Sequence, residues 1–423
     1  MSGRHLAEPG HRTTYRETFA VGEFRSMFSA QVVSMVGDQV AAVSLAVLLY
    51  ARSHSAFVAG LGYATVYLPW LVGGPLLAAW AERLPPRRVL VGCDLGRAAL
   101  IGLAAVPGVP LPVLGALVFL AAMLAPPFEA TSSALLPQVL VGDRYAVGAS
   151  AIHALHQAAQ LVGFVAGGAA VLVLGANTAL LLNAGSFAVS AVFLHRGLTS
   201  RPAVAGTGRN RLIRETLDGL LIVARDRRLS GPLLLGIVGA AYLVVPEAVA
   251  APYAASLGAG AGGVGMIMAA AAGGSVLGAV VLGRLVPPLL RRRLMWPLAL
   301  AGCLPLVLVV SRPGLGVTLV LLAVAGAAGA FQVTANTSFA TAAPPEGRAR
   351  AVSFAMAGMC AGQSLAIVLA GAVATVIPPT EVVAGAAVLG AVTLVVLRPL
   401  VGSAPEPRPV SWSAPGRAAL DPA

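Results

Sequence analysis

The stretch SMVGDQVAAVSLAVLLY, residues 34–50, has the hydrophobicity of a membrane-spanning helix, yet it contains an acidic residue. The apolar run begins near residue 27. A rise of about 1.5 Å per residue therefore places Asp38 about 16 Å deep, near the middle of a hydrocarbon core about 30 Å thick. A carboxylate at that depth costs on the order of 2.5 to 3.5 kcal/mol by insertion scales, and chains rarely keep one without using it. Asp38 therefore indicates a functional site inside a membrane.

The composition indicates that the whole chain is an integral membrane protein. Of its 423 residues, 58% are hydrophobic and 10% are charged, and the mean hydropathy is +0.86. That is more apolar surface than a soluble core can bury, so the lipid bilayer is its expected environment. Apolar runs of about 18 to 25 residues predict an all-α membrane protein with twelve transmembrane helices. The predicted spans are 27–50, 56–79, 89–107, 112–128, 148–173, 178–195, 231–254, 262–285, 294–310, 315–338, 351–376 and 382–398.

Arginine supplies all 28 basic residues, and its distribution predicts the orientation of the helices. The loops on one side of the spans carry nearly all of it, and the opposite loops carry Arg52 and Arg312. By the positive-inside rule the arginine-rich side is the cytoplasm. We therefore expect a multi-pass protein of the cell (plasma or inner) membrane with both termini in the cytoplasm. The net charge of +12 is explained by this topology, and we expect no nucleic acid partner.

The two halves of the chain resemble each other. Segments 81–90 and 283–294 each contain Arg-Leu, then Pro-Pro, then an arginine cluster, and Asp38 in span 1 has a counterpart in Glu247 of span 7. Basic loops are often alike, but the matched acids favour a true duplication into pseudo-symmetric bundles, with a substrate path between them. The expected organisation is a cytoplasmic tail (1–26), a six-helix bundle (27–195), a cytoplasmic linker with an amphipathic helix (196–230), a second six-helix bundle (231–401) and a disordered cytoplasmic tail (402–423).

Several segments together resemble the major facilitator superfamily, and within it the macrolide-efflux type of drug:proton antiporters. They are EFRSMFSAQVVSMVGDQV at the start of span 1, DLGR in span 3, FEATSSALLPQVL, LLNAGSFAVSAV in span 6, and RETLDGLLIVARDRRL in the linker. The resemblance covers residues 23–398. It implies the major facilitator fold, alternating access and proton-coupled efflux.

The loop between spans 2 and 3, AAWAERLPPRRV, is similar to the charged signature of that superfamily, although Ala78 and Pro85 replace its glycines. A carboxylate beside a cationic loop can form a latch that holds one conformation. Asp94 and Arg97, three residues apart, share a helix face and can join this network. Topology-setting charge and a structural ion pair are the alternatives. The predicted gating loop and inner charge network comprises Glu82, Arg83, Arg87, Arg88, Asp94 and Arg97.

Span 5 contains QLVGFVAGGAAV, which is similar to the antiporter signature G-P-x-x-G-G with phenylalanine in place of proline. Small residues spaced in this way permit close helix packing, with or without drug transport. The predicted packing motif is Gly163, Gly167 and Gly168. Nearby, His153 and His156 are too few to hold a metal, and the three cysteines show no ligand spacing, so we expect neither a metal nor a cofactor.

Asp38 and Glu247 are the predicted proton-coupling residues, with Asp38 the first of the two. A hydrogen bond from Asp38 to a neighbouring helix is the structural alternative. Neutral polar residues in or near the spans are predicted to line the substrate path: Gln31, Gln39, Gln160, Asn183, Gln332, Asn336 and Gln363.

These features predict a secondary active transporter that exports hydrophobic or amphiphilic small molecules in exchange for protons. A transporter of a specific metabolite, such as a siderophore or a sugar, is the alternative. A chain without lysine contains no P-loop, which excludes this route to ATP-driven pumping. No catalytic motif suggests a membrane-embedded enzyme, and the retained acids argue against a transport-dead homologue. We expect the protein to act as a monomer.

Overall fold

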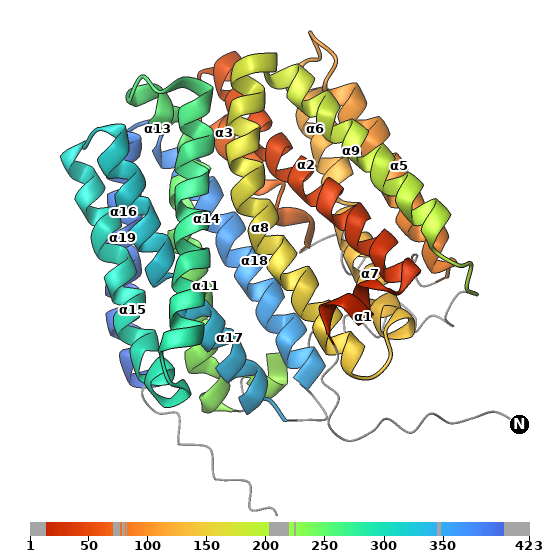
Figure 1. Ribbon diagram of the computed structural model, residues 1–423. Helices are drawn as coiled ribbons and strands as arrows, with labels where there is room; N and C mark the ends of the chain where they lie inside the picture. The colour runs from red at the N-terminus through yellow and green to blue at the C-terminus, as the bar shows by residue number, and fades with distance from the viewer. Residues whose placement is uncertain are drawn as a thin grey trace, which may run out of the picture.

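The computed structural model describes residues 14–70, 77, 81, 83–202, 220–223, 226–344 and 348–401, and within these ranges the chain forms helices and no strands. Two bundles lie side by side (Figure 1). The first contains α1 (Tyr15–Phe19), α2 (Gly22–Ser53), α3 (Ala56–Ala64), α5 (Pro86–Ala104), α6 (Leu111–Ala122), α7 (Ala125–Val139), α8 (Asp143–Leu174) and α9 (Ala176–Gly197). The second contains α11 (Arg227–Leu243), α12 (Val245–Ala248), α13 (Ala250–Ser256), α14 (Gly260–Leu285), α15 (Pro288–Leu308), the 3-10 turn Val309–Ser311, α16 (Leu315–Ala328), α17 (Phe331–Ala342), α18 (Arg348–Val373) and α19 (Pro379–Val401).

The all-α membrane fold is confirmed, and the described residues contain ten helical segments long and apolar enough to cross a membrane. Two of the twelve predicted spans are outside this set. Span 89–107 corresponds to α5, whose 19 residues include the charged pair Asp94 and Arg97. Span 56–79 is described only through residue 70 and at residue 77.

The first helix starts earlier than predicted, and α1 lies within the predicted N-terminal tail. Glu23, in the first turn of α2, accepts hydrogen bonds from the backbone and side chain of Thr199 at 2.8 and 2.5 Å, and forms a 2.6 Å ion pair with Arg201. These contacts fix the start of α2 to the segment after α9. Most of the predicted amphipathic helix and the tail from 402 onward lie outside the described residues.

The two bundles repeat one packing pattern. In the first, α2 packs against α8 and α9, and α5 packs against α6 and α9. In the second, the equivalent helices pair in the same way: α11 with α18 and α19, and α15 with α16 and α19. The interruption between α6 and α7 also has its counterpart between α16 and α17. The predicted pseudo-symmetry is therefore present in the helix packing itself.

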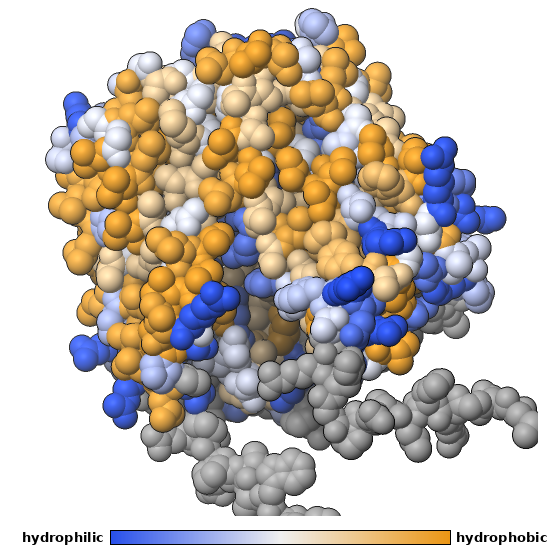
Figure 2. Space-filling view, viewed as in Figure 1, coloured by the Kyte–Doolittle hydropathy of each residue, from blue (hydrophilic) through white to orange (hydrophobic). Residues whose placement is uncertain are grey.

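On the face that Figure 2 shows, the flank of both bundles is mostly apolar, as expected where a lipid bilayer would contact it. Large exposed apolar side chains include Leu172, Leu289 and Val396. One end of the molecule, here the arginine-rich end, carries Arg83, Arg87, Arg88, Arg144, Arg196, Arg201, Arg291, Arg292, Arg293, Arg348 and Arg350. The opposite, arginine-poor end carries Arg52 and Arg312.

The bundles meet along two helix pairs, α8 with α14 and α3 with α18. At each of these two crossings, both helices contribute a glycine. A Cβ added at Gly265 would lie 2.7 Å from the Cα of Gly168, and one added at Gly60 would lie 3.2 Å from the Cα of Gly371. All four glycines are in the turns nearest the arginine-poor end. Direct backbone contact therefore closes the bundles together at that end.

Replacing Gly265 with alanine should separate α14 from α8, because the new methyl group meets backbone atoms that cannot rotate away. We expect Gly265→Ala to cost about 1 to 3 kcal/mol, the usual range for overpacking. The measurement is the thermal midpoint of the detergent-purified protein. Gly185→Ala is the control, because a Cβ there meets nothing within 4 Å. Equal midpoints for the two variants would show that the close crossing carries no packing energy.

Candidate functional site

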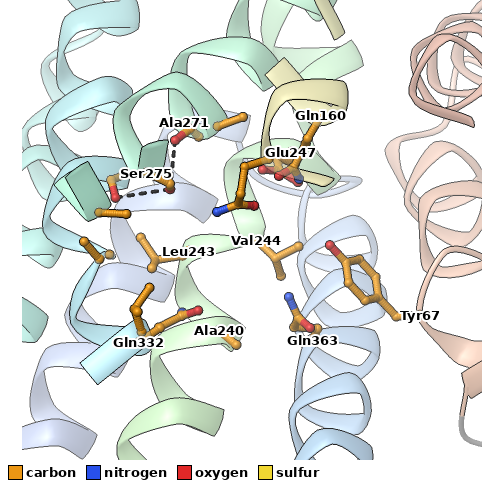
Figure 3. Close-up of a pocket in the computed structure, with 17 residues that line it drawn as sticks. Tyr67, Gln160, Ala240, Leu243, Val244, Glu247, Ala271, Ser275, Gln332 and Gln363 are labelled. Atoms are coloured by element: carbon orange, nitrogen blue, oxygen red, sulfur yellow. Dashed lines mark hydrogen bonds between the residues drawn. The ribbon is translucent and has the colours of Figure 1, made fainter. Parts of the chain in front are cut away.

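A cavity of about 200 Å³ lies between the two bundles. The first bundle contributes α8 and the turn after α3, and most of the wall comes from the second (Figure 3). Its lining residues are Tyr67, Gln157, Gln160, Ala240, Leu243, Val244, Glu247, Ala271, Ala272, Ser275, Ala279, Gly326, Gly329, Ala330, Gln332, Val333 and Gln363.

Glu247 is the carboxylate of this cavity, and a break in the seventh span positions it. The helix ends at Leu243 and resumes as the four-residue α12, which has Pro246 in its first turn. Proline is tolerated there because the first N–H groups of a helix have no partner within the helix. Glu247 is 9% exposed, and its carboxylate accepts a hydrogen bond from the hydroxyl of Tyr63. Because Tyr63 belongs to α3, this bond joins the two bundles.

Four carboxamides surround the same space. Gln157 and Gln160 come from α8, Gln332 from α17 and Gln363 from α18. Tyr67 lies beside Tyr63, with ring centroids 6.1 Å apart at an interplanar angle of 71°. The cavity is thus a polar chamber inside an apolar protein, with hydrogen-bonding groups from both bundles.

Three of the residues predicted to line a path are on the cavity wall: Gln160, Gln332 and Gln363. The others lie elsewhere. Gln31 is buried and donates to Ser132 at 3.2 Å, Asn183 is buried at the contact of α9 with α2, and Asn336 is exposed. Gln39 packs against Gly163 at the contact of α2 with α8.

The sequence analysis missed Tyr63, Tyr67, Gln157 and Ser275. Tyrosines near an apolar run resemble ordinary interface residues, and only the folded chain brings Tyr63 to Glu247, 184 positions away. Gln157 was identifiable, because it precedes Gln160 by three residues and so shares its helix face. The hydroxyl of Ser275 donates hydrogen bonds to the carbonyl oxygens of Ala271 at 3.0 Å and Gly326 at 3.2 Å (Figure 3).

A second polar constellation lies inside the first bundle. Asp94 is fully buried, accepts a 2.5 Å hydrogen bond from Ser190, and has an oxygen 3.9 Å from the guanidinium of Arg97. Arg97 is held between two aromatic rings, with its guanidinium carbon 5.4 Å from the centroid of Phe128 and 5.1 Å from that of Phe187. Cation–π contacts of this kind add stability where the cation is desolvated.

Asp38 belongs to this constellation rather than to the cavity wall. It is half-buried on α2 and interacts electrostatically with Arg97, Asp94 and Glu129. Glu129 is a further residue that the sequence analysis did not single out. Three carboxylates and one guanidinium therefore share one low-dielectric region.

The predicted gating loop is described in part. Arg83 and Arg88 are exposed and Arg87 is half-buried, whereas Glu82 lies outside the described residues. Of the packing motif, Gly163 and Gly167 lie against α2, and Gly168 against Gly265. His153 and His156 are exposed on α8, and within the described part of the chain no group of three or more His, Cys, Asp or Glu could hold a metal ion.

A polar chamber between two symmetry-related helical bundles, inside an apolar membrane-facing shell, defines a membrane transporter. A sequence model of the Major Facilitator Superfamily matches residues 27–247 and 241–421, so the chain belongs to that superfamily. A comparison with curated proteins finds no match.

Solved transporters share the fold at low sequence identity. The nucleoside transporter NupG has a TM-score of 0.68 at 14% identity, covering 89% of this chain and 98% of that one. A POT family transporter in complex with 5-aminolevulinic acid has a TM-score of 0.69 at 12% identity, covering 90% and 96%. A bacterial homologue of the human lysosomal transporter Spinster, inward-facing and unoccupied, has a TM-score of 0.65 at 14% identity, covering 92% and 97%.

Removing Arg97 should leave the buried carboxylate of Asp94 without its counter-charge. We expect Arg97→Ala to lose about 3 to 5 kcal/mol, as for other broken buried pairs. The double variant Asp94→Asn/Arg97→Ala should regain part of that loss, because the amide carries no charge to compensate. Gel-filtration recovery after graded heating measures both. A double variant no more stable than Arg97→Ala would contradict an ionic role for the pair.

Proposed function

We propose that the protein is a proton-coupled exporter of hydrophobic or amphiphilic small molecules that works by alternating access. In this proposal the arginine-rich end faces the cytoplasm, in agreement with the positive-inside rule, and the protein resides in the cell membrane. Asp38 and Glu247 are the proposed proton-coupling residues.

The observation that carries the proposal is the position of Glu247. One carboxylate lines the central cavity and also accepts a hydrogen bond from the opposite bundle. Protonation removes the charge that strengthens such a bond, and a ligand in the cavity competes for the same oxygens. Proton binding, substrate binding and contact between the bundles are therefore linked at one group, as coupled transport requires.

Asp38 supports the proposal in a different way. Together with Asp94 and Glu129 it places more carboxylates than cations around Arg97. In this proposal one of these acids takes up a proton, which lowers the excess of negative charge around Arg97. The constellation can therefore store a proton within the first bundle.

The conformation fits an inward-open state. The glycine crossings hold the bundles together at the arginine-poor end. Figure 2 shows a recess between the bundles, on the arginine-rich side of the middle. A substrate would then enter the cavity from the cytoplasm and leave after the crossings open.

A transporter of one specific metabolite is the second candidate, and the four carboxamides of the cavity favour it. Amide groups bind hydrogen-bonding substrates with defined geometry, whereas multidrug pockets depend mainly on apolar contact. A substrate panel that mixes hydrophobic drugs, including a macrolide, with sugars and siderophores separates the two candidates by which compounds the protein moves.

The coupling proposal predicts that Asp38→Asn and Glu247→Gln lose accumulation driven by a pH gradient. One pH unit is worth about 1.4 kcal/mol per proton, which is tenfold in a concentration ratio. The measurement is the accumulation, in everted vesicles under a pH gradient, of a compound that the wild-type protein moves. We expect each variant to lose most of that tenfold ratio, because an amide has the size of the acid but does not titrate.

Glu381→Gln is the matched control, because Glu381 pairs with Arg312 at the exposed arginine-poor end, with a distance of 3.0 Å. It should accumulate substrate like the wild type. Full gradient-driven accumulation by both Asp38→Asn and Glu247→Gln would rule out these acids as the coupling sites.

A further inference from the structure

The charge balance of the central cavity is one-sided. Among the described residues that line it, Glu247 is the one carboxylate, and none is an arginine or a histidine. Its hydrogen-bond partner, Tyr63, is a neutral hydroxyl on the opposite bundle. A buried carboxylate without a counter-ion creates a negative potential that favours a cation.

Two buried or half-buried arginines, Arg97 and Arg201, form ion pairs with other acids. Arg97 pairs with Asp94, and its guanidinium lies between two phenylalanine rings. Arg201 pairs with Glu23 at the arginine-rich end. Neither side chain lines the cavity. The described part of the wall therefore offers Glu247 no positively charged side chain, which leaves a proton or the bound molecule as the source of a positive charge.

The rest of the wall suits an organic cation. Tyr67 lines the cavity beside Tyr63, and an aromatic face attracts an ammonium group, most strongly where water is excluded. The carbonyl oxygens of the four glutamines accept hydrogen bonds from a protonated amine. Figure 3 shows Gln160 near Glu247, and Gln332 and Gln363 on opposite walls of the same space.

The volume limits the size of the cation. Drug-sized pockets measure roughly 300 to 1,000 Å³, and this cavity measures about 200 Å³. It therefore accommodates an ammonium group with one ring or a short chain. A larger amphiphile would leave its remainder in the recess toward the arginine-rich end.

We propose that the substrates are organic monocations, and that Glu247 and Tyr67 bind the positive head group in place of the Tyr63 hydroxyl. This proposal rests on the proposed transport function for the role of the cavity, and it adds the charge class of the cargo. The cation breaks the bond between Glu247 and Tyr63, so binding releases one contact between the bundles.

Equilibrium binding to the detergent-purified protein, with no pH gradient, tests the proposal. The probe is radiolabelled benzyltrimethylammonium, and the comparison ligand is benzenesulfonate, an anion of similar size. The wild-type protein should bind the cation saturably, and benzenesulfonate should fail to compete even at a hundredfold excess. Absence of saturable cation binding, or equal competition by the anion, would overturn the proposal without recourse to any variant.

Variants locate the site. Glu247→Gln should weaken binding of the cation at least tenfold, and Glu381→Gln should leave it unchanged. Tyr63→Phe should strengthen it severalfold, because the phenyl ring no longer donates to the carboxylate that the cation needs. Unchanged affinity in Glu247→Gln, or a severalfold loss in Tyr63→Phe, would contradict the assigned roles.

The binding assay and the vesicle assay fail independently. If a pH gradient drives export of neutral compounds but the protein does not bind the cation, the cation site is refuted and the proposed function is retained. Binding of the cation without proton-driven movement of any compound would retain the cation site and refute proton-coupled export.

Discussion

A hydrocarbon environment offers no hydrogen bonds, and this constraint governs the whole molecule. Backbone groups at membrane depth must be paired within a helix, or lie where protein or a water-filled cavity satisfies them. The chain interrupts its helices between α11 and α12 and between α16 and α17. Val244, Gly329 and Ala330, which lie at these interruptions, all line the central cavity. The irregular backbone at these two interruptions therefore lies beside the polar chamber.

The two buried acids illustrate two ways to keep a carboxylate in such an environment. In the first bundle, Asp94 has a hydroxyl donor and an arginine fixed between aromatic rings. In the second bundle, Glu247 has a neutral partner that belongs to the other half of the molecule. Breaking the first arrangement costs a buried ion pair, whereas the second is exchanged for another donor at much lower cost. The first arrangement is therefore costly to disturb, and the second is easier to rearrange.

Much of the fold was predictable because its signals are local. Apolar runs, arginine-rich loops and the matched positions of Asp38 and Glu247 all follow from the linear sequence. The contents of the cavity were less accessible, because helix rotation and the depth of a residue along its helix both decide which polar residue reaches the cavity. Asn336 and Gln332 are four residues apart on α17 and so share its face, yet Gln332 lines the cavity and Asn336 does not. The bond between Tyr63 and Glu247 depends on how two bundles dock, and hydropathy contains no information about docking.

The glycine crossings have a mechanical consequence. Gly168 with Gly265 and Gly60 with Gly371 are two points of backbone contact, and for as long as both contacts hold, they define a line about which one bundle could turn against the other. From Gly168 to the start of α8 at Asp143 the helix extends roughly 37 Å at about 1.5 Å per residue. With that lever arm, a rotation of about 10° moves the far end by roughly 6 Å, enough to admit a small molecule. The absence of side chains at four positions thus allows a small change near the pivot to become a wide aperture at the other end.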